Sequence, residues 1–321
     1  MRYLVTGGAG YIGSIVARML VEGGHEVTIL DDCSTGHADA VPAGARLVRD
    51  TVHNAAIVAG DGFDAVFHFA GLIAAGESMD RPGDYWNANT VGTLALLEAM
   101  RGGGIGRLVF SSTAAVYGDP ERLPIPETAA TVPTSTYGAT KLAADAAISS
   151  YCVAHDLAAV SLRYFNVAGA WRDGDGVWHG ERHATETHLI PLALDAAAGN
   201  RDKLRLFGDD YDTPDGTCVR DYIHVADLAE AHLLAVDAAE PGAHRVFNLG
   251  NGVGFSNREV IATVEAVTGL PVPVERAPRR SGDPATLVAS SEAAHDELGW
   301  APSRRDLSTI VGDAWEFHRH G

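Results

Sequence analysis

Cysteine is scarce in this chain and follows no pattern. The 321 residues contain three cysteines, at Cys33, Cys152 and Cys218. That number is too small, and the spacing too wide, for a disulfide framework. The cysteines show no metal-ligand spacing either, and we expect no bound metal ion. Reduced thiols of this kind favour a cytoplasmic protein.

Positive charge and long apolar runs are also in short supply. The formal net charge is −18, and nucleic-acid binding needs a basic surface, so we expect no nucleic-acid partner. No apolar run approaches the roughly 20 residues that a membrane helix needs. Met1 and Arg2 lead directly into a strand-like stretch, and no signal peptide is expected. The sequence therefore predicts a protein that binds neither nucleic acid nor membrane.

What the first half does contain is a regular alternation of short apolar runs and helix-like segments. Such alternation predicts an α/β fold, in which helices cover both faces of a parallel sheet. The expected strands are 3–6, 26–30, 46–48, 65–69, 107–111 and 159–165, and the expected helices are 12–22, 89–100 and 137–155.

The pattern loosens after Asn166. Residues 171–187 are rich in Gly, Asp, Glu and His and are expected to form a long loop. Helices are predicted at 189–198 and at 257–268, the second capped by Ser256. A further strand is expected at 246–249.

A glycine-rich turn joins the first strand to the first helix. Gly8, Gly10 and Gly13 match the G-x-G-x-x-G spacing, which lets backbone N–H groups approach a pyrophosphate at a helix N-terminus. An ordinary Gly-rich turn is the alternative. The strand–turn–helix context favours a dinucleotide site, as does Asp31 at the end of the second strand, which could accept from both ribose hydroxyls. A carboxylate there would repel a 2′-phosphate, so NAD is favoured over NADP and a Rossmann-like, doubly wound sheet is predicted.

Tyr137 and Lys141 form the strongest candidate for chemistry. On a helix, a spacing of four places both side chains on one face. A phenol has a free pKa of about 10, and a shift to neutrality requires roughly 4 kcal/mol. An ammonium about 4 Å away supplies that amount at an effective dielectric of 20. The pair could thus remove a proton from a sugar hydroxyl, although a surface Tyr and Lys on an ordinary helix remain the alternative.

Several blocks of the sequence together resemble the extended short-chain dehydrogenase/reductases. They are 6–13, 68–78, 111–118 and 137–141. Three further blocks are similar to those of the UDP-glucose 4-epimerases within that family. They are 162–166, 219–225 and 280–283. The resemblance implies an NAD-binding Rossmann domain at 1–166, to which later segments such as 219–250 return, and a smaller UDP-sugar-binding α/β domain at 167–321.

The resemblance also implies a reaction. Thr113, Tyr137 and Lys141 would be catalytic, and a UDP-hexose such as UDP-galactose would be inverted at C4 through a 4-keto sugar, with tightly bound NAD. Dehydratases of the superfamily carry an Asp-Glu pair after the hydroxyl residue, where this chain has Ala114 and Ala115. A methyl group moves no proton, so dehydration is disfavoured.

The remaining site residues are also implied by the resemblance. The expected cofactor contacts are Gly7, Gly10, Tyr11, Ile12, Gly13, Asp31, Asp32, Asp50, Thr51, Phe69, Ala70, Gly71, Asn89, Ser111, Tyr137, Lys141 and Tyr164. The expected substrate contacts are Ser112, Thr113, Tyr137, Asn166, His188, Leu189, Phe207, Arg220, Arg280, Asp283 and Leu287.

These substrate contacts have separate roles. Asn166 would bind the diphosphate, and Arg220 and Arg280 would clamp its two phosphates, because guanidinium suits bidentate phosphate contact. Asp283 would hold the uridine ribose and Phe207 would lie beside the uracil. The alternatives are an Arg220–Asp221 ion pair and a core position for Phe207.

Three positions depart from the resemblance. Ile73 stands where some epimerases carry a Lys, and His188 replaces an Asn seen in some relatives. Leu287 stands where a Tyr would fill the sugar pocket beside C2. The smaller side chain could admit an N-acetyl group, so UDP-N-acetylhexosamines are further candidate substrates, unless a neighbour fills the gap.

The sequence leaves two other functions open and suggests one assembly. An epimerase of UDP-pentose or UDP-uronate sugars fits the same scaffold, and a non-catalytic dinucleotide sensor would be expected to lose Tyr137 or Lys141. The family usually forms homodimers through two long helices. The candidates are 89–100 and 137–155, and the second carries Ala143, Ala144, Ala146 and Ala147, which allow close helix approach.

Overall fold

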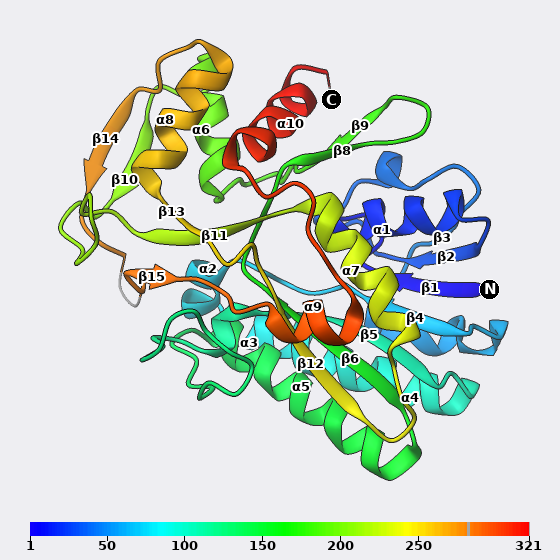
Figure 1. Cartoon of the computed structure of the whole chain (residues 1–321). Coiled ribbons are helices and arrows are strands. Elements are labelled where there is room, and N and C mark those ends of the chain that lie inside the picture. Colours follow the sequence, from blue (N-terminus) through cyan, green and yellow to red (C-terminus); the bar gives the residue numbers. More distant parts are fainter. Residues whose placement is uncertain (281–282, 321) are drawn as a thin grey trace.

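The computed structural model describes residues 1–280 and 283–320, and its centre is a seven-stranded sheet. The strand order is β12-β6-β5-β4-β1-β2-β3, and every pairing is parallel (Figure 1). The predicted doubly wound α/β sheet is therefore confirmed. The strands are β1 (Arg2–Thr6), β2 (Glu26–Leu30), β3 (Arg46–Val48), β4 (Ala65–His68), β5 (Arg107–Thr113), β6 (Ala158–Tyr164) and β12 (His244–Leu249).

Alternate residues of each strand feed two separate cores, one on each face of the sheet. In β1, Tyr3 and Val5 pack with one pair of helices, whereas Leu4 packs with the other pair. Both faces are buried, which is why these strands are almost continuously apolar. In Figure 1 the first pair lies above the sheet and the second pair below it. The pairs are α1 (Tyr11–Glu22) with α7 (Val225–Asp237), and α4 (Gly92–Gly103) with α5 (Thr136–His155).

Late segments of the chain return to this sheet. β12 pairs with β6, and α7 packs against α1. α9 (Glu292–Leu298) and Trp300 join the same core, and the Trp300 indole donates to the carbonyl of Asp227 at 2.8 Å. The predicted boundary near Asn166, with a return at 219–250, stays a prediction about domain organisation.

The other C-terminal segments surround a smaller core of their own, which includes Ile190, Val260 and Ile310. Helices α6 (Leu189–Ala198) and α8 (Asn257–Thr268) coincide with the predicted 189–198 and 257–268. Ser256 forms a capping box with Glu259, which fixes the start of α8. The remaining elements here are β7 (Asn166–Ala168), β10 (Leu204–Phe207), β11 (Val219–His224), β13 (Gly254–Ser256), β14 (Val274–Ala277), β15 (Thr286–Leu287) and α10 (Leu307–His320).

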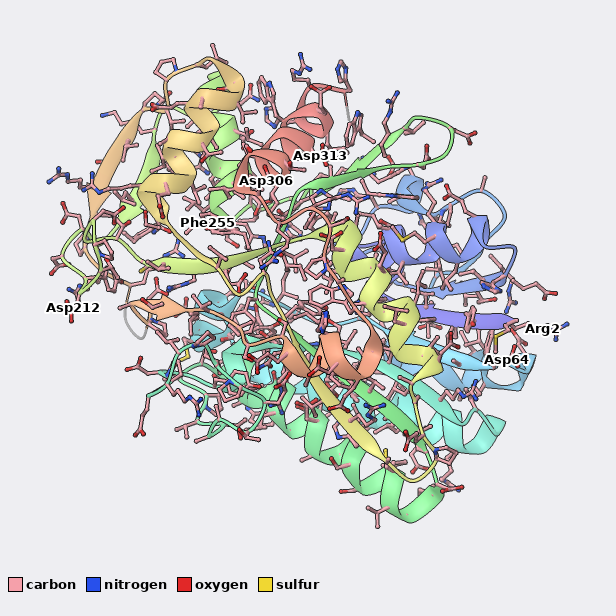
Figure 2. All side chains as sticks on the ribbon, viewed as in Figure 1. Arg2, Asp64, Asp212, Phe255, Asp306 and Asp313 are labelled. Carbon is pink, nitrogen blue, oxygen red and sulfur yellow. The ribbon has the colours of Figure 1, made fainter. Side chains whose placement is uncertain are left out.

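β11 connects the two parts of the molecule. It pairs with β7 and β15 in parallel and with β13 in antiparallel fashion. At its end, His224 Nε2 lies 3.1 Å from a carboxylate oxygen of Asp313, which Figure 2 labels on α10. This contact ties the strand to the last helix.

Two predicted elements were wrong in part. The expected loop 171–187 contains an antiparallel hairpin of β8 (Ala170–Arg172) and β9 (Trp178–Gly180), whose turn is held because Asp173 accepts from the N–H groups of Asp175 and Val177. The expected helix 89–100 begins as a π-helical segment, Trp86–Val91, and continues as α4. Short helices α2 (Ala75–Asp80) and α3 (Pro82–Tyr85) precede it.

Within residues 1–280 and 283–320, no helix combines the length and the apolar character that crossing a membrane requires.

Candidate active site

The candidate site lies where the strand order reverses. β1 is flanked by β2 on one side and by β4 on the other, so the chain first adds strands on one side of β1 and then on the other. The loops that follow β1 and β4 diverge at the carboxyl ends of these strands. Open parallel sheets bind ligands at such a switch point. The glycine-rich turn, the turn after β4 and Thr113 at the end of β5 all lie at this edge.

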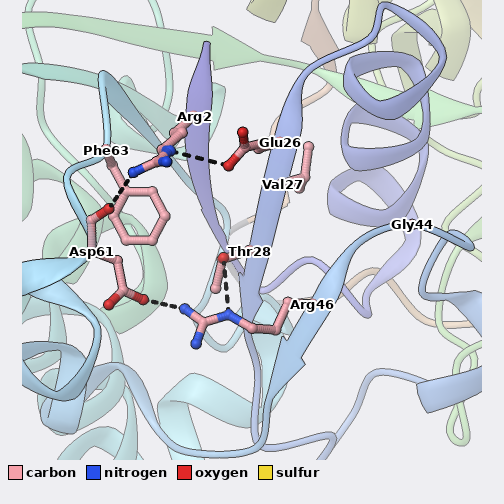
Figure 3. A pocket seen from close by; sticks show the side chains of 8 residues that line it. All are labelled: Arg2, Glu26, Val27, Thr28, Gly44, Arg46, Asp61 and Phe63. Carbon is pink, nitrogen blue, oxygen red and sulfur yellow. Dashed lines mark hydrogen bonds and ion pairs between the residues drawn. The ribbon is translucent and has the colours of Figure 1, made fainter.

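A cavity at the opposite edge of the sheet is not a candidate active site, because its charged side chains are already paired with one another. A cavity of about 420 Å³ lies at the starts of β1 and β2, and Figure 3 shows the side chains that line it. Its two arginines already have partners, since Arg2 pairs with Glu26 (Nε–Oε2 3.0 Å) and Arg46 with Asp61. No predicted site residue lines it.

The glycine-rich turn fits a pyrophosphate. Gly7 has a φ of +73°, and a Cβ there would lie 2.5 Å from the backbone N of Ala70. A Cβ on Gly13 would lie 2.3 Å from the Gly7 carbonyl oxygen, so the helix packs directly on the turn. Gly10 is the N-cap of α1 and offers no side chain to the first N–H groups, and those donors are available to an anion.

Asp31 is fixed beside this turn. Its carboxylate accepts from the Ala9 N–H at 2.9 Å and from the Cys33 N–H at 2.8 Å. Each oxygen keeps a further lone pair for a ribose hydroxyl. Asp32, in contrast, is exposed and accepts from the Ser34 N–H at 2.8 Å. Asp50 accepts from the Thr51 N–H at 2.7 Å, which fixes the turn after β3.

Asn89 holds the turn after β4 against α5. Its side chain accepts from the Leu72 N–H at 2.8 Å and donates to the Leu72 carbonyl at 3.0 Å. A Cβ built on Gly71 would lie 2.7 Å from Asn89 Oδ1 and 3.7 Å from Lys141 Nζ. The structure thereby brings together three residues that the sequence predicts as cofactor contacts.

The start of α5 positions Tyr137. Ser135 caps the helix by accepting from the Gly138 N–H at 3.2 Å, and the Tyr137 N–H donates to Ser78 Oγ at 3.0 Å. One turn later, Lys141 Nζ donates to the Ser111 carbonyl at 2.8 Å. The sequence did not identify Ser78 as a site residue, because its role is visible only once α2 packs on α5.

The pKa values differ from the sequence-based expectation. Burial raises the pKa of the Tyr137 phenol, and a side-chain hydrogen bond with Thr113 opposes that rise. Burial also lowers the pKa of Lys141 to about 8, against the opposing charge of Asp145. The lowering of the phenol pKa by Lys141 stays a prediction, because the desolvation of Tyr137 dominates its pKa in this structure.

The two serines before Thr113 have different roles. Ser111 Oγ hydrogen-bonds to the Tyr164 hydroxyl, and both side chains lie at the ends of neighbouring strands. Ser112 is fully buried and donates to Asp145 at 3.2 Å. Its side chain is thus engaged within the protein, and its contact with substrate stays a prediction.

Four of the predicted substrate residues form two pairs. Arg220 forms an ion pair with Asp283, and Arg280 stacks on the Phe207 ring with its guanidinium carbon 4.1 Å from the centroid. The Arg220–Asp221 alternative was wrong. Ser281 and Gly282 of the same sequence block lie outside the described residues.

Asp221 is instead a buried anchor that the sequence did not single out. It accepts from the N–H groups of Asn251 (2.7 Å), Gly252 (3.0 Å) and Ala289 (3.1 Å). Burial raises its pKa to about 6, while these backbone donors act in the opposite direction. It holds two segments, the 251–252 turn and the stretch at Ala289, against β11.

Leu287 lies opposite Arg220 in the β11–β15 ladder. It packs with Phe165 on a cluster that includes Ala114 and Val116, the residues just after Thr113. The predicted sugar-pocket residue is thus brought close to the predicted catalytic hydroxyl.

Three further predicted substrate residues lie in β7 and at the start of α6. Asn166 pairs with Tyr222 in the β7–β11 ladder, and Leu189 packs on the smaller core as the first residue of α6. His188 turns Nδ1 toward Glu181, and this atom is not free for the diphosphate.

A parallel sheet with a glycine turn, a fixed acid and a Tyr–Lys pair on one helix face is the arrangement of a nicotinamide-dependent enzyme. The family model described as "NAD dependent epimerase/dehydratase family" matches residues 3–250. The chain belongs to this family.

Its similarity extends over the full length of known relatives. The UDP-glucose 4-epimerase of Corynebacterium glutamicum is 56% identical over 319 residues, which cover 99% of this chain and 95% of the relative. A solved UDP-glucose 4-epimerase from Brucella ovis in complex with NAD has a TM-score of 0.92 at 44% identity, with 98% of each chain covered. One from Bifidobacterium longum in complex with NAD⁺ and UDP has a TM-score of 0.93 at 35% identity and covers 99% of this chain and 98% of that one. The predicted resemblance to the UDP-glucose 4-epimerases is confirmed.

Proposed function

We propose that the protein interconverts UDP-galactose and UDP-glucose by inversion at C4, with NAD as a bound cofactor. The observation that carries the proposal is the meeting of Thr113, Tyr137 and Lys141 at the buried end of β5, beside the glycine turn. The similarity to named UDP-glucose 4-epimerases supports the substrate.

The chain's own residues move one proton. Tyr137, as phenolate, accepts the proton of the 4-hydroxyl and later returns it, while Thr113 donates to the phenolate and lowers its pKa. Lys141 is held by Ser111 with its charge at the end of β5. Ala114 and Ala115 offer no second acid or base, which leaves epimerisation rather than dehydration.

NAD, when bound, supplies the two-electron oxidant and reductant that carry C4 through a 4-keto sugar. The turn Gly7–Gly13 and the N-terminus of α1 would hold its pyrophosphate, and Asp31 its adenosine ribose. Gly71, Asn89 and Lys141 would lie along its other half.

The substrate would be held by the two pairs of the smaller part. Arg220 and Arg280 offer guanidinium groups to the diphosphate. Asp283 would accept from the uridine ribose, and Phe207 would stack on the base. Asn166 and Leu189 border this region from β7 and α6.

A wider substrate range is a second proposal. Leu287 packs beside Ala114 and Val116, and a leucine leaves out the outer ring and hydroxyl of a tyrosine. We propose that UDP-N-acetylgalactosamine is also accepted. We further propose a homodimer formed by α4 and α5, and a cytoplasmic location, which the three free cysteines favour.

The test is incubation of purified protein with UDP-galactose, followed by chromatography of the sugar nucleotides. Conversion to UDP-glucose is expected, and Tyr137→Phe should lower turnover by about 10²–10⁴-fold. Tyr151→Phe is the matched control, because Tyr151 lies on the same helix and its hydroxyl contacts Glu98 on the surface. A Tyr137→Phe protein with the turnover of the control would overturn the mechanism.

A further inference from the structure

Four potential metal ligands converge at the junction between the β8–β9 hairpin and α6. They are Glu181, His183, Glu186 and His188, and one ligand atom of each lies within 4.8 Å of all the others. Among the described residues this is the one such cluster of three or more His, Cys, Asp or Glu side chains. The sequence contained its signal, the spacing E-x-H-x-x-E-x-H, although we expected no metal from the cysteines.

Two of the distances suit a four-coordinate ion. Metal–ligand bonds of about 2.0–2.1 Å in a tetrahedral zinc site separate the ligand atoms by roughly 3.3 Å. His183 Nδ1 lies 3.1 Å from Glu181 Oε1 and 3.3 Å from Glu186 Oε2. His188 Nδ1 contacts the same Glu181 oxygen at less than this separation, so these two atoms would move apart when the ion binds.

The ligands are oriented by neighbouring groups. Glu186 Oε1 accepts from the N–H groups of Thr187 (2.7 Å) and His188 (2.8 Å), which turns its other oxygen toward His183. Such outer contacts fix ligand orientation in metal sites. The side chains of Glu181 and Glu186 are 5% and 12% exposed, whereas those of His183 and His188 are 23% and 43% exposed. An adjoining cavity of about 300 Å³, lined in part by Glu181, His183 and Glu186, gives an ion a route in.

We propose that these four residues bind one Zn²⁺ ion in a closed, structural site. Two carboxylates and two neutral imidazoles give a charge of −2, which Zn²⁺ neutralises. Four protein ligands leave no open position, and closed sites stabilise structure rather than activate water. The proposal is independent of the proposed function.

The position of the cluster indicates what the ion would stabilise. Glu181 follows β9 directly, and His188 is the N-cap of α6 and makes no capping hydrogen bond. Arg182, between two ligands, pairs with Asp39, and its carbonyl lies 2.7 Å from His37 Nε2. The ion would therefore close the segment 181–188 and fix it against the loop that follows β2, beside the cofactor edge.

The competing explanation is a network of protonated histidines and glutamates without metal. The ion pairs with Glu181 and Glu186 raise the pKa of His183 to about 10. Zn²⁺ would replace two protons at the same net charge, so binding should weaken as the pH falls. The two explanations differ in metal content.

The experiment uses tag-free protein, stripped with chelator and then dialysed against a small excess of Zn²⁺. Metal counted by mass spectrometry should give one ion per chain in wild type and in His179→Gln, and below one-tenth in His183→Gln and in Glu186→Gln. His179 is the matched control, because it lies on the same hairpin and pairs with Asp173 (Nε2–Oδ2 2.7 Å) outside the cluster. Co²⁺ in place of Zn²⁺ should give the strong visible absorption of a tetrahedral site.

Two outcomes would overturn the proposal. If wild-type protein retains less than one-tenth of an ion per chain, the four residues form only the metal-free network of protonated histidines and glutamates. Equal metal content in wild type and in both cluster variants identifies adventitious binding elsewhere. Because the wild-type count alone can contradict the proposal, it does not depend on how well the variants fold.

Discussion

Lys141 donates a hydrogen bond from Nζ to the main-chain carbonyl of Ser111, 2.8 Å away. The contact joins α5 to the end of β5 and places a cation in the interior, where the Lys141 residue is only 2% exposed. It also fixes the helix so that Tyr137, one turn earlier, meets Thr113. Placing the lysine there lowers the stability of the fold, because burial disfavours its charged form.

Lys141→Met is expected to separate activity from stability. Turnover should fall by about 10²–10⁴-fold, because the variant loses the cation that we propose to assist Tyr137. The free energy of unfolding at pH 7 should not fall, since a lysine pKa lowered from 10.5 to about 8 corresponds to roughly 3 kcal/mol of cost. Denaturant titration and a turnover assay measure the two effects.

The pH dependence supplies the control for that prediction. Between pH 8 and pH 10.5 the unfolded chain binds a proton at Lys141 that the folded chain has lost, so wild-type stability rises relative to the variant as the pH increases. Lys203→Met, at an exposed lysine, should change neither quantity. If the difference in free energy of unfolding between wild type and Lys141→Met stays constant from pH 7 to pH 10.5, burial of Lys141 does not carry the free-energy cost assigned to it.

Asp31→Asn is expected to reduce the preference for NAD over NADP. The amide keeps the shape of the carboxylate but removes the charge that repels a 2′-phosphate, and it loses one acceptor for the Ala9 or Cys33 N–H. Calorimetry on cofactor-free protein should show weaker NAD binding and a NAD/NADP ratio about tenfold smaller. Asp64→Asn is the control, because that exposed carboxylate accepts from the Arg2 N–H at the opposite edge of the sheet. An unchanged NAD/NADP ratio would show that Asp31 does not contact the adenosine ribose.

Arg280→Met should weaken substrate binding without affecting the fold. Arg280 is exposed and stacks on Phe207, so its replacement should remove the proposed phosphate contact without disturbing a buried core. We expect the KM for UDP-galactose to rise about 10–100-fold, equivalent to roughly 1.4–2.8 kcal/mol, with a smaller change in kcat. Arg279→Met is the control, because Arg279 already pairs with Asp210 and stacks on Tyr211. Equal KM values for the two variants would place the diphosphate elsewhere.

The sequence predicted the sheet well because its signals are local. Strands buried on both faces are almost entirely apolar, and the Gly7–Gly13 turn and Asp31 lie within one β–α–β unit. The helix 257–268 was predicted to the residue because Ser256 and Glu259 form a capping box that is legible in the sequence.

The sequence could not supply contacts between distant segments. The Arg220–Asp283 pair spans 63 residues, and the support of Tyr137 by Ser78 spans 59. The raised pKa of Tyr137 results from burial, which no spacing reveals. The hairpin at 170–180 was missed because its strands are three residues long and polar turn residues dominate the composition.

Leu287→Tyr is expected to narrow the range of substrates. The larger ring would occupy space beside Phe165 and Ala114, near Thr113, the proposed catalytic hydroxyl. The value of kcat/KM for UDP-N-acetylgalactosamine should fall at least tenfold, about 1.4 kcal/mol, while that for UDP-galactose changes little. Leu287→Met, of similar volume, should leave both values near wild type. Wild-type protein without activity on the acetylated sugar would refute the proposed dual specificity.

Leu94→Glu is expected to convert a homodimer into a monomer. Val91 and Leu94, three residues apart at the start of α4, are 47% and 38% exposed, which is unusual for apolar side chains that share a helix face. α4 packs beside α5 (Figure 1), where the half-buried Ala143 and Ala147 would allow a second copy to approach closely. A charge in such an interface should raise the dimer dissociation constant about 100-fold or more, equivalent to roughly 3 kcal/mol. Sedimentation velocity should show a dimer for wild type and for Val177→Glu, whose exposed valine lies in the turn of the β8–β9 hairpin, and a monomer for Leu94→Glu. A wild-type monomer, or a Leu94→Glu protein that remains dimeric, would rule out this face as the interface.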